Sequence, residues 1–221
     1  MVTNLILIRH GQGRHQTDNF VGGWTDTELT DLGKLQAENV AYRLGKILEG
    51  EVKIVSSDIK RAAQTAESIS RVLMVDIEYD ELLREINQGI ADGVNREKLL
   101  EIKAPKTNPI LDWRPYEKAE TWREFDQRVQ KFMSKLDMYS TNTLVIVAHS
   151  QTIVSIIHNW LDFGDAQKSV TDIRIDNCSL TLLSKLADNT KLIRTLNDIS
   201  HFNTEDTILS KEHVIMNSRF R

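Results

Sequence analysis

Short apolar runs alternate with longer amphipathic segments along most of this chain. Runs typical of strands cover residues 4–8, 52–56, 143–148, 179–184 and 191–196. The three central runs are almost continuously apolar, which is typical of strands buried on both faces. Five strands are therefore expected, separated by segments long enough to hold helices.

The intervening segments carry helical periodicity. Apolar residues recur at three- and four-residue spacing within 30–48, 58–73, 120–138 and 152–161. Thr30 is suited to cap the first of these helices. The apolar stripe from Trp122 to Leu136 is typical of a helix packed on a core, not of a cofactor site.

Alternating strands and helices predict an α/β fold. We expect one domain over residues 1–221, built as three α/β/α layers around a mainly parallel sheet. All three prolines, Pro105, Pro109 and Pro115, fall within residues 87–119. That segment is expected to be irregular and to act as a lid or a wall of the substrate pocket.

Composition narrows the class of protein. The chain has 28 basic and 32 acidic residues, so nothing indicates a nucleic-acid or anionic-membrane surface. A single cysteine, Cys178, precludes an intramolecular disulfide and is expected to be a small buried residue at the start of a strand. No segment has the ~18 apolar residues of a membrane span, and no signal peptide is evident. We expect a cytoplasmic protein.

Three polar groups follow predicted strands. They are Arg9-His10-Gly11, Ser56-Ser57-Asp58 with Arg61, and Ala148-His149-Ser150. If the strands are neighbours, two arginines and two histidines meet in one crevice beside helix N-termini, where an anion is favoured. Histidine can act as a nucleophile and arginine can hold a phosphate.

The chain resembles the histidine phosphatase superfamily, in the branch of cofactor-dependent phosphoglycerate mutases and small bacterial phosphatases. Seven motifs match in order. They are Arg9-His10-Gly11, Gly23-Trp24-Thr25-Asp26, Leu29-Thr30-Asp31-Leu32-Gly33, Ser56-Ser57-Asp58 with Arg61-Ala62, Leu83-Arg84-Glu85 with Gly89, Val147-Ala148-His149, and Asn197-Asp198 with His201.

The resemblance implies a phosphohistidine on His10, with the phosphoryl group held by Arg9, Arg61 and His149 and with Glu85 as acid and base. It also implies substrate contacts from Gln16, Gly23 and Ser150, a small phosphorylated metabolite as substrate, and no cofactor or metal. A homodimer is an expectation from the family alone.

The chain departs from the family pattern close to the nucleophile. Gln12 and Gly13 replace the usual Glu-Thr, Gln16 replaces an asparagine, and Ser150 replaces a glycine. Glu120 resembles the glutamate of a Gly-Glu-Ser motif with altered flanks, and we interpret it as a helix-capping residue.

Four other functions compete with a phosphatase. We do not find the paired arginines or longer insertion of the mutases, so hydrolysis is preferred over a cofactor-dependent phosphoglycerate mutase. A dinucleotide loop at Gly11-Gln12-Gly13 lacks its third glycine and a following helix. An esterase based on Ser150 with His201 would leave Arg9 and Arg61 unused. The last alternative is a non-catalytic module that binds phosphorylated partners.

Overall fold

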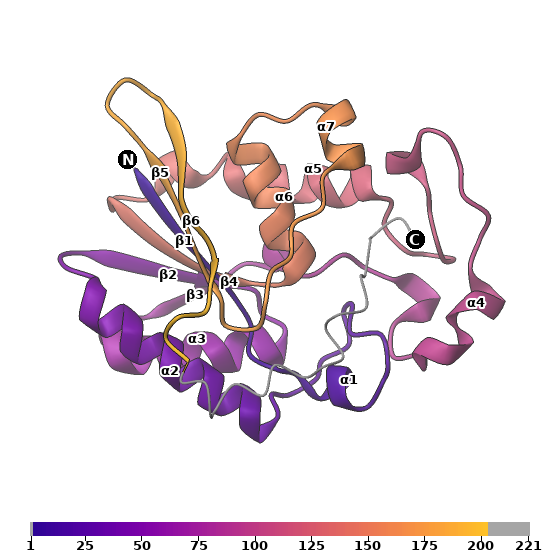
Figure 1. The fold of residues 1–221 in the computed structure, drawn as a ribbon, viewed down its shortest axis with the longest axis horizontal. Coiled ribbons are helices and arrows are strands. Elements are labelled where there is room, and N and C mark those ends of the chain that lie inside the picture. Colours follow the sequence, from indigo (N-terminus) through magenta and orange to yellow (C-terminus); the bar gives the residue numbers. More distant parts are fainter. Residues whose placement is uncertain (1, 203–221) are drawn as a thin grey trace.

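A six-stranded mixed sheet organises the computed structural model, which describes residues 2–202 (Figure 1). The strand order is β3-β2-β4-β1-β5-β6. The four strands at one side, β3 (Ile77–Tyr79), β2 (Val52–Ser56), β4 (Thr143–Ala148) and β1 (Asn4–Arg9), are parallel. Of the last two strands, β5 (Leu180–Lys185) pairs antiparallel with β1, and β6 (Lys191–Asp198) pairs antiparallel with β5. The predicted α/β class is confirmed, with an antiparallel edge.

All five expected strands are present, with ends shifted by two residues at most. Within residues 2–202, the one strand that the sequence prediction missed is β3, a three-residue edge strand whose side chains are largely exposed. Cys178 is buried as expected, but it precedes β5 with a left-handed φ of 51° and does not start a strand.

Two helical layers cover the sheet, as Figure 1 shows. The helices α2 (Asp31–Ile47) and α3 (Lys60–Leu73) pack on one face, against Ile6 and Ile8 of β1. On the other face, α5 (Trp122–Met133) and α6 (Ser150–Trp160) pack against Leu5 and Leu7. Successive residues of β1 therefore face opposite layers, and both sets are buried, as their uninterrupted apolar pattern requires.

Helix ends follow local capping chemistry. The Thr30 hydroxyl accepts the Gly33 N–H and starts α2, as predicted. Thr121 and Glu124 form a capping box at the start of α5. This corrects the assignment of the capping role to Glu120, which lies one residue before the cap. The helix α6 begins at Ser150, two residues earlier than expected.

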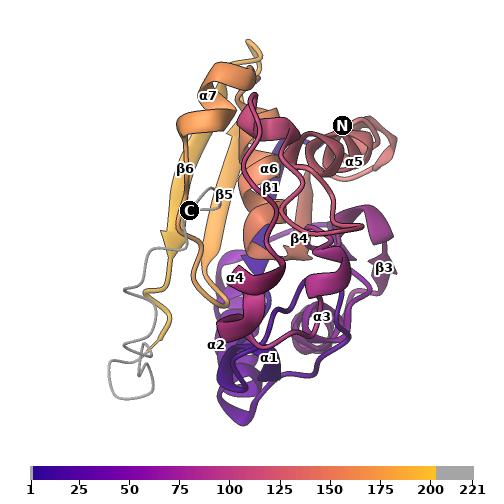
Figure 2. The same cartoon turned by 90° about the vertical axis from the view of Figure 1, so that its right-hand side faces the viewer.

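Residues 87–119 contain no strand. They hold 3₁₀ turns at Gly89–Ala91, Arg96–Lys98 and Ile110–Asp112, and the short helix α4 (Leu99–Ile102), which lies toward the viewer in Figure 2. The segment packs on the loop after β1 through an isolated bridge between Phe20 and Asn95. The predicted irregularity is confirmed, whereas the role of lid or pocket wall stays a prediction. Two further short helices, α1 (Arg14–Thr17) and α7 (Asp165–Val170), were not expected.

The strand order brings together the segments predicted to carry chemistry. Both β1 and β2 pair with β4, so all three parallel strands end side by side. Arg9 is opposite Ala148, and Ser56 is opposite Val147. The groups that follow these strands therefore share one edge of the sheet, the usual ligand position of an open α/β fold.

Candidate active site

His10 follows β1 directly and is almost fully buried, with 2% of its surface exposed. Its N–H donates to the Ala148 carbonyl of the neighbouring strand, which fixes the backbone at this position. The ring atom Nδ1 lies 2.6 Å from the Gly11 carbonyl. Because a carbonyl only accepts, Nδ1 carries the proton and Nε2 presents a lone pair. That lone pair faces the Arg61 Nε–H at 3.2 Å.

The surroundings keep His10 neutral. Burial lowers its pKa well below 6.5, and the nearby Arg61, His149 and Arg9 lower the pKa further. Protonation would add a positive charge to a site that already has several cationic neighbours. The His10 ring is therefore neutral at neutral pH, with an unprotonated Nε2, which is the state that a nucleophilic imidazole needs.

Two arginines lie beside the ring, of which Arg61 is buried and Arg9 is half-buried. Arg61 lies in the first turn of α3 and donates from its terminal nitrogens to the carbonyls of Thr25 and Gly23 at 2.8 Å each. Arg9 donates to the Ile175 carbonyl at 2.6 Å. Burial lowers the pKa of Arg61 to about 10, so the guanidinium stays charged at neutral pH. Both arginines are thus fixed cations at the edge of the sheet.

His149 follows β4 and is the N-cap of α6. It is fully buried, and its ring centre lies 5.1 Å from that of His10. Its Nε2 lies 2.9 Å from the Ser57 hydroxyl. Burial lowers the pKa of His149 well below 6.5, so one ring nitrogen carries a proton and the other does not.

Two polar atoms of this group have no hydrogen-bond partner within residues 2–202. They are Arg9 Nε and His149 Nδ1, both buried. Buried polar atoms are nearly always paired, so such orphans call for a ligand. Beside Arg61 and the N-terminal end of α6, that ligand is expected to be an anion.

Glu85 lies in the stretch between the 3₁₀ turn Glu81–Leu83 and the turn at Gly89–Ala91. Its carboxylate accepts the N–H groups of Ile86 at 2.9 Å and of Gln151, in the first turn of α6, at 3.2 Å. Burial raises the pKa of Glu85, although both hydrogen bonds and the charges of Arg61 and Arg9 oppose that rise. A carboxyl group with a raised pKa can both donate and accept a proton near neutral pH.

The three predicted substrate contacts lie around the same group. Gly23 contributes its carbonyl to Arg61, and Ser150 is the first residue of α6. The Gln16 amide is already paired, since it exchanges two 3.1 Å hydrogen bonds with Asn177 and accepts the Gly13 N–H. Substrate contacts from Gln16, Gly23 and Ser150 stay predictions.

Asn177 was not foreseen from the sequence. Besides pairing with Gln16, it donates to the His10 carbonyl at 2.9 Å and is itself 8% exposed. The Cys178 N–H donates to the Arg9 carbonyl. Residues 175–178 therefore form a clamp that holds the backbone of Arg9 and His10, which also includes the Ile175 carbonyl bonded to Arg9. Asn197 of the tail motif supports this clamp through two hydrogen bonds to Asp176.

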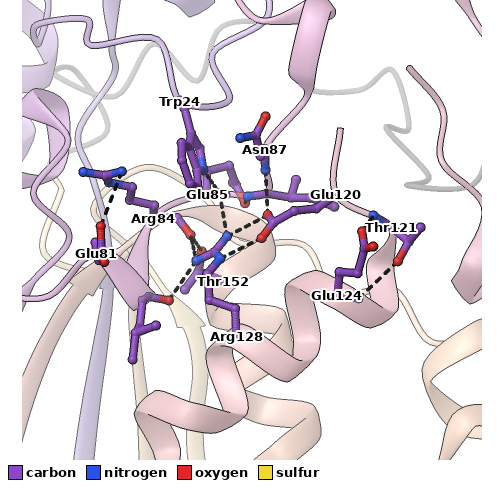
Figure 3. A network of polar contacts seen from close by, with 12 residues as sticks. Trp24, Glu81, Arg84, Glu85, Asn87, Glu120, Thr121, Glu124, Arg128 and Thr152 are labelled. Atoms are coloured by element: carbon purple, nitrogen blue, oxygen red, sulfur yellow. Dashed lines mark hydrogen bonds and ion pairs between the residues drawn. The ribbon is translucent and has the colours of Figure 1, made fainter. Parts of the chain in front are cut away.

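A second polar network lies behind Glu85 (Figure 3). The guanidinium of Arg128, from α5, donates to both oxygens of Glu120 and to the carbonyl of Glu85. The indole N–H of Trp24 donates to the same carbonyl at 2.7 Å. Glu120 is thus an ion-pair partner of Arg128 and not a helix cap.

The rival sites are not assembled. Ser150 has no histidine among its hydrogen-bond partners in the described part of the chain, and His201 contacts Arg43. A helix that was not expected from the sequence, α1, follows Gly11-Gln12-Gly13. It has four residues, which is shorter than the helix that follows the glycine loop of a dinucleotide site. No helix within residues 2–202 is long and apolar enough to cross a membrane. No group of three potential metal ligands occurs in that range.

Comparison with known proteins connects this geometry to a family. The sequence model of the histidine phosphatase superfamily (branch 1) matches residues 5–199. The protein named "Putative phosphoserine phosphatase 2" of Hydrogenobacter thermophilus is 29% identical over 204 residues, covering 89% of this chain and 96% of its own length. "Probable phosphoglycerate mutase GpmB" of Escherichia coli is 28% identical, covering 88% and 93%.

Solved structures agree on the fold. A mycobacterial glucosyl-3-phosphoglycerate phosphatase in complex with VO3 superposes with a TM-score of 0.76 at 25% identity, covering 89% of this chain and 99% of that one. The α-ribazole phosphatase from Shigella flexneri superposes with a TM-score of 0.75 at 22% identity, covering 88% and 96%.

Proposed function

The chain belongs to the histidine phosphatase superfamily (branch 1), and on that premise we propose that it hydrolyses small phosphomonoesters through a phosphohistidine on His10. One observation supports this most directly. The unprotonated Nε2 of a buried, neutral histidine lies beside two fixed arginine cations, and the buried atoms Arg9 Nε and His149 Nδ1 nearby have no partner within residues 2–202. Such a site suits a nucleophile that attacks a bound phosphoryl group.

In the first step, the phosphoryl oxygens would replace the missing partners of Arg9 Nε and His149 Nδ1. The lone pair of His10 Nε2 attacks phosphorus while the bond from phosphorus to the ester oxygen breaks. The Glu85 carboxyl group gives its proton to the departing oxygen, so the leaving group is an alcohol and not an alkoxide. The arginines stabilise the charge that spreads over the phosphoryl oxygens.

In the second step, the Glu85 carboxylate takes a proton from water. The water oxygen attacks phosphorus, the phosphorus–nitrogen bond breaks, and its electron pair returns to His10 Nε2. Inorganic phosphate leaves, and Glu85 is again protonated for the next cycle. One covalent intermediate thus divides a difficult displacement into two easier ones.

A generic aryl phosphate tests this proposal. We expect steady phosphate release that is abolished by His10→Asn. Rapid quenching in alkali should trap a phosphoryl group on the peptide that contains His10. Phosphate release unchanged by His10→Asn, or a covalent adduct of a serine-directed phosphonate on Ser150, would contradict the proposal. Absence of turnover on every phosphoester would favour a binding module.

Glu85→Gln tests the acid and base role. We expect a large loss of phosphate release, since the amide can neither give nor take the required proton. Glu81→Gln is a matched control, because Glu81 lies in the preceding 3₁₀ turn with an exposed side chain. Equal activity in the two variants would rule out the role of Glu85.

The mutase alternative has one observation in its favour. Arg96, in the segment 87–119, is near enough to the site for its charge to lower the pKa of Arg9 and of His15. An additional cation there suits a substrate with a second anionic group. A screen of candidate substrates should therefore include phosphoserine, glucosyl-3-phosphoglycerate and 3-phosphoglycerate. The last should be tested with and without 2,3-bisphosphoglycerate. Isomerisation of 3-phosphoglycerate without phosphate release would identify a mutase.

The remaining predictions concern the setting of the enzyme. A cytoplasmic location and a homodimer stay predictions from the sequence. The segment 87–119 is proposed as a wall of the substrate pocket, because Arg96 belongs to it. None of these properties is needed for the chemistry at His10.

A further inference from the structure

Arg128 has an unusually complete set of partners. Nε and Nη2 donate to the two oxygens of Glu120 at 2.8 Å each, which forms a bidentate ion pair. Nη1 donates to the carbonyls of Leu82 and Arg84, and Nη2 also donates to the carbonyl of Glu85. The guanidinium has five N–H groups, so each has an acceptor.

Three of the five acceptors of Arg128 are backbone carbonyls of the stretch that carries Glu85. This stretch, residues 82–87, belongs to no sheet, and beyond the 3₁₀ turn that ends at Leu83 it has no helical ladder to fix it. Arg128 gathers three of its carbonyls, and Glu120 accepts the Asn87 N–H at 2.9 Å (Figure 3). Its backbone is thus fixed mainly by side chains.

Further contacts hold the same peptide groups from the other side. Trp24 Nε1 donates to the Glu85 carbonyl, and the Thr152 hydroxyl donates to the Arg84 carbonyl. Arg128 also lies against the Trp24 ring, with its guanidinium carbon 5.7 Å from the ring centre. The backbone of Glu85 is therefore enclosed by Arg128, Trp24 and α6.

The Glu120–Arg128 pair is well shielded, with side chains 18% and 14% exposed. Removing either partner would leave a shielded charge without its counterpart. Because the pair is neutral overall, it contributes geometry more than charge to the site. The charges that act most on the Glu85 carboxyl group are those of Arg61 and Arg9.

We propose that Arg128 is a positioning residue, fixed by Glu120, that holds the backbone of Glu85 so that its carboxyl group meets the leaving oxygen. This role rests on the proposed phosphatase function. A displacement of about 1 Å can cost about 100-fold in rate when a reacting group must be aligned. Loss of the pair should therefore remove proton donation while phosphate binding and attack by His10 persist.

Leaving-group dependence separates this role from a general structural one. An alkyl phosphate needs proton donation because its alkoxide is a poor leaving group, whereas 2,4-dinitrophenyl phosphate does not. The value of kcat/KM reports the first chemical step for both substrates. We expect Arg128→Lys to lower kcat/KM about 100-fold for an alkyl phosphate and less than about fivefold for the dinitrophenyl ester.

Two variants keep the test independent of misfolding. Glu120→Gln retains the shape and one acceptor for Arg128, so we expect the same selectivity with a smaller loss, about tenfold for the alkyl ester. Arg123→Lys is the matched control. Arg123 lies on the same helix and pairs with Asp112 and Asp165, away from residues 82–87, so both substrates should be unaffected.

Glu85→Gln distinguishes failure of the inference from failure of the proposed function. Suppose that Glu85→Gln shows the selective loss, but Arg128→Lys lowers kcat/KM equally for both substrates or for neither. The positioning role is then wrong, and the phosphatase mechanism stands. If Glu85→Gln itself shows no selectivity, Glu85 is not the acid, and the positioning role of Arg128 fails with it. The phosphohistidine on His10 is decided separately by His10→Asn.

Discussion

Asn177→Ala is the most informative single change to the hydrogen bonds that hold the backbone of His10. Asn177 donates to the His10 carbonyl and exchanges two hydrogen bonds with Gln16. Alanine removes all three bonds without adding bulk. The perturbation therefore reaches both the backbone of His10 and the glutamine that departs from the family pattern.

The expected magnitude follows from burial. Asn177 is 8% exposed, and a buried hydrogen bond contributes about 1 kcal/mol net. The His10 carbonyl also loses its side-chain donor, and an unsatisfied buried acceptor costs about 1–3 kcal/mol. Partial relaxation of Gln16, which keeps its bond to the Gly13 N–H, reduces the total. We expect the free energy of unfolding to fall by about 2–4 kcal/mol.

Urea unfolding followed by tryptophan fluorescence measures this loss, with phosphate release measured in parallel. Asn142→Ala is the control, since Asn142 is exposed and its side chain has no hydrogen bond within residues 2–202. In a double-mutant cycle with Gln16→Ala, we expect a coupling energy of about 1–2 kcal/mol. A loss within about 0.5 kcal/mol of the control, or no coupling, would refute the role of the clamp.

Three further predictions concern neighbouring groups. Ser57→Ala removes the hydroxyl whose donation to His149 Nε2 would favour a proton on Nδ1; we expect about tenfold lower kcat/KM and weaker inhibition by inorganic phosphate. Burial raises the pKa of Asp92 from 3.8 to about 6, so the stability supplied by its proton is complete below pH 3.8 and is lost as pH rises through about 6. Asp92→Asn should therefore gain about 1 kcal/mol in unfolding free energy relative to wild type between pH 4 and pH 8; a pH-independent difference would contradict this. Gly89→Ala should cost at least about 2 kcal/mol, because φ is +58° and the new Cβ would lie 2.1 Å from a backbone carbonyl oxygen. Gly93→Ala, with φ of +77° and open space, should lose only about 1 kcal/mol, and equal losses would rule out the clash.

The sequence was sufficient to predict the core of the fold. Apolar runs, interrupted only by Lys53 in β2, identify β1, β2 and β4, because strands buried on both faces have mostly apolar residues on both faces. The edge strand β3 has no such signal, since its three residues are mostly exposed. Strand neighbours could only be assumed from the sequence, and the structure confirms that assumption.

The candidate site was predictable where chemistry requires a residue type. His10 directly follows β1, and Arg61 lies in the first turn of the helix after β2, at the edge of the sheet where an open α/β fold usually binds its ligand. Arg128 and Glu120 could not be interpreted in this way, because an arginine and a glutamate near a helix start are common surface residues. Their partners lie in residues 82–87, 33 to 46 positions away, and no local pattern reports that contact.

The clamp at residues 175–178 also sets the order in which this enzyme can become active during synthesis. Arg9 and His10 are among the first residues to be made, whereas their partners Ile175 and Asn177 follow 166 and 167 positions later. At typical rates of translation, roughly ten to thirty seconds separate the two events. A nascent chain therefore carries His10 without these partners until residues 175–178 emerge from the ribosome.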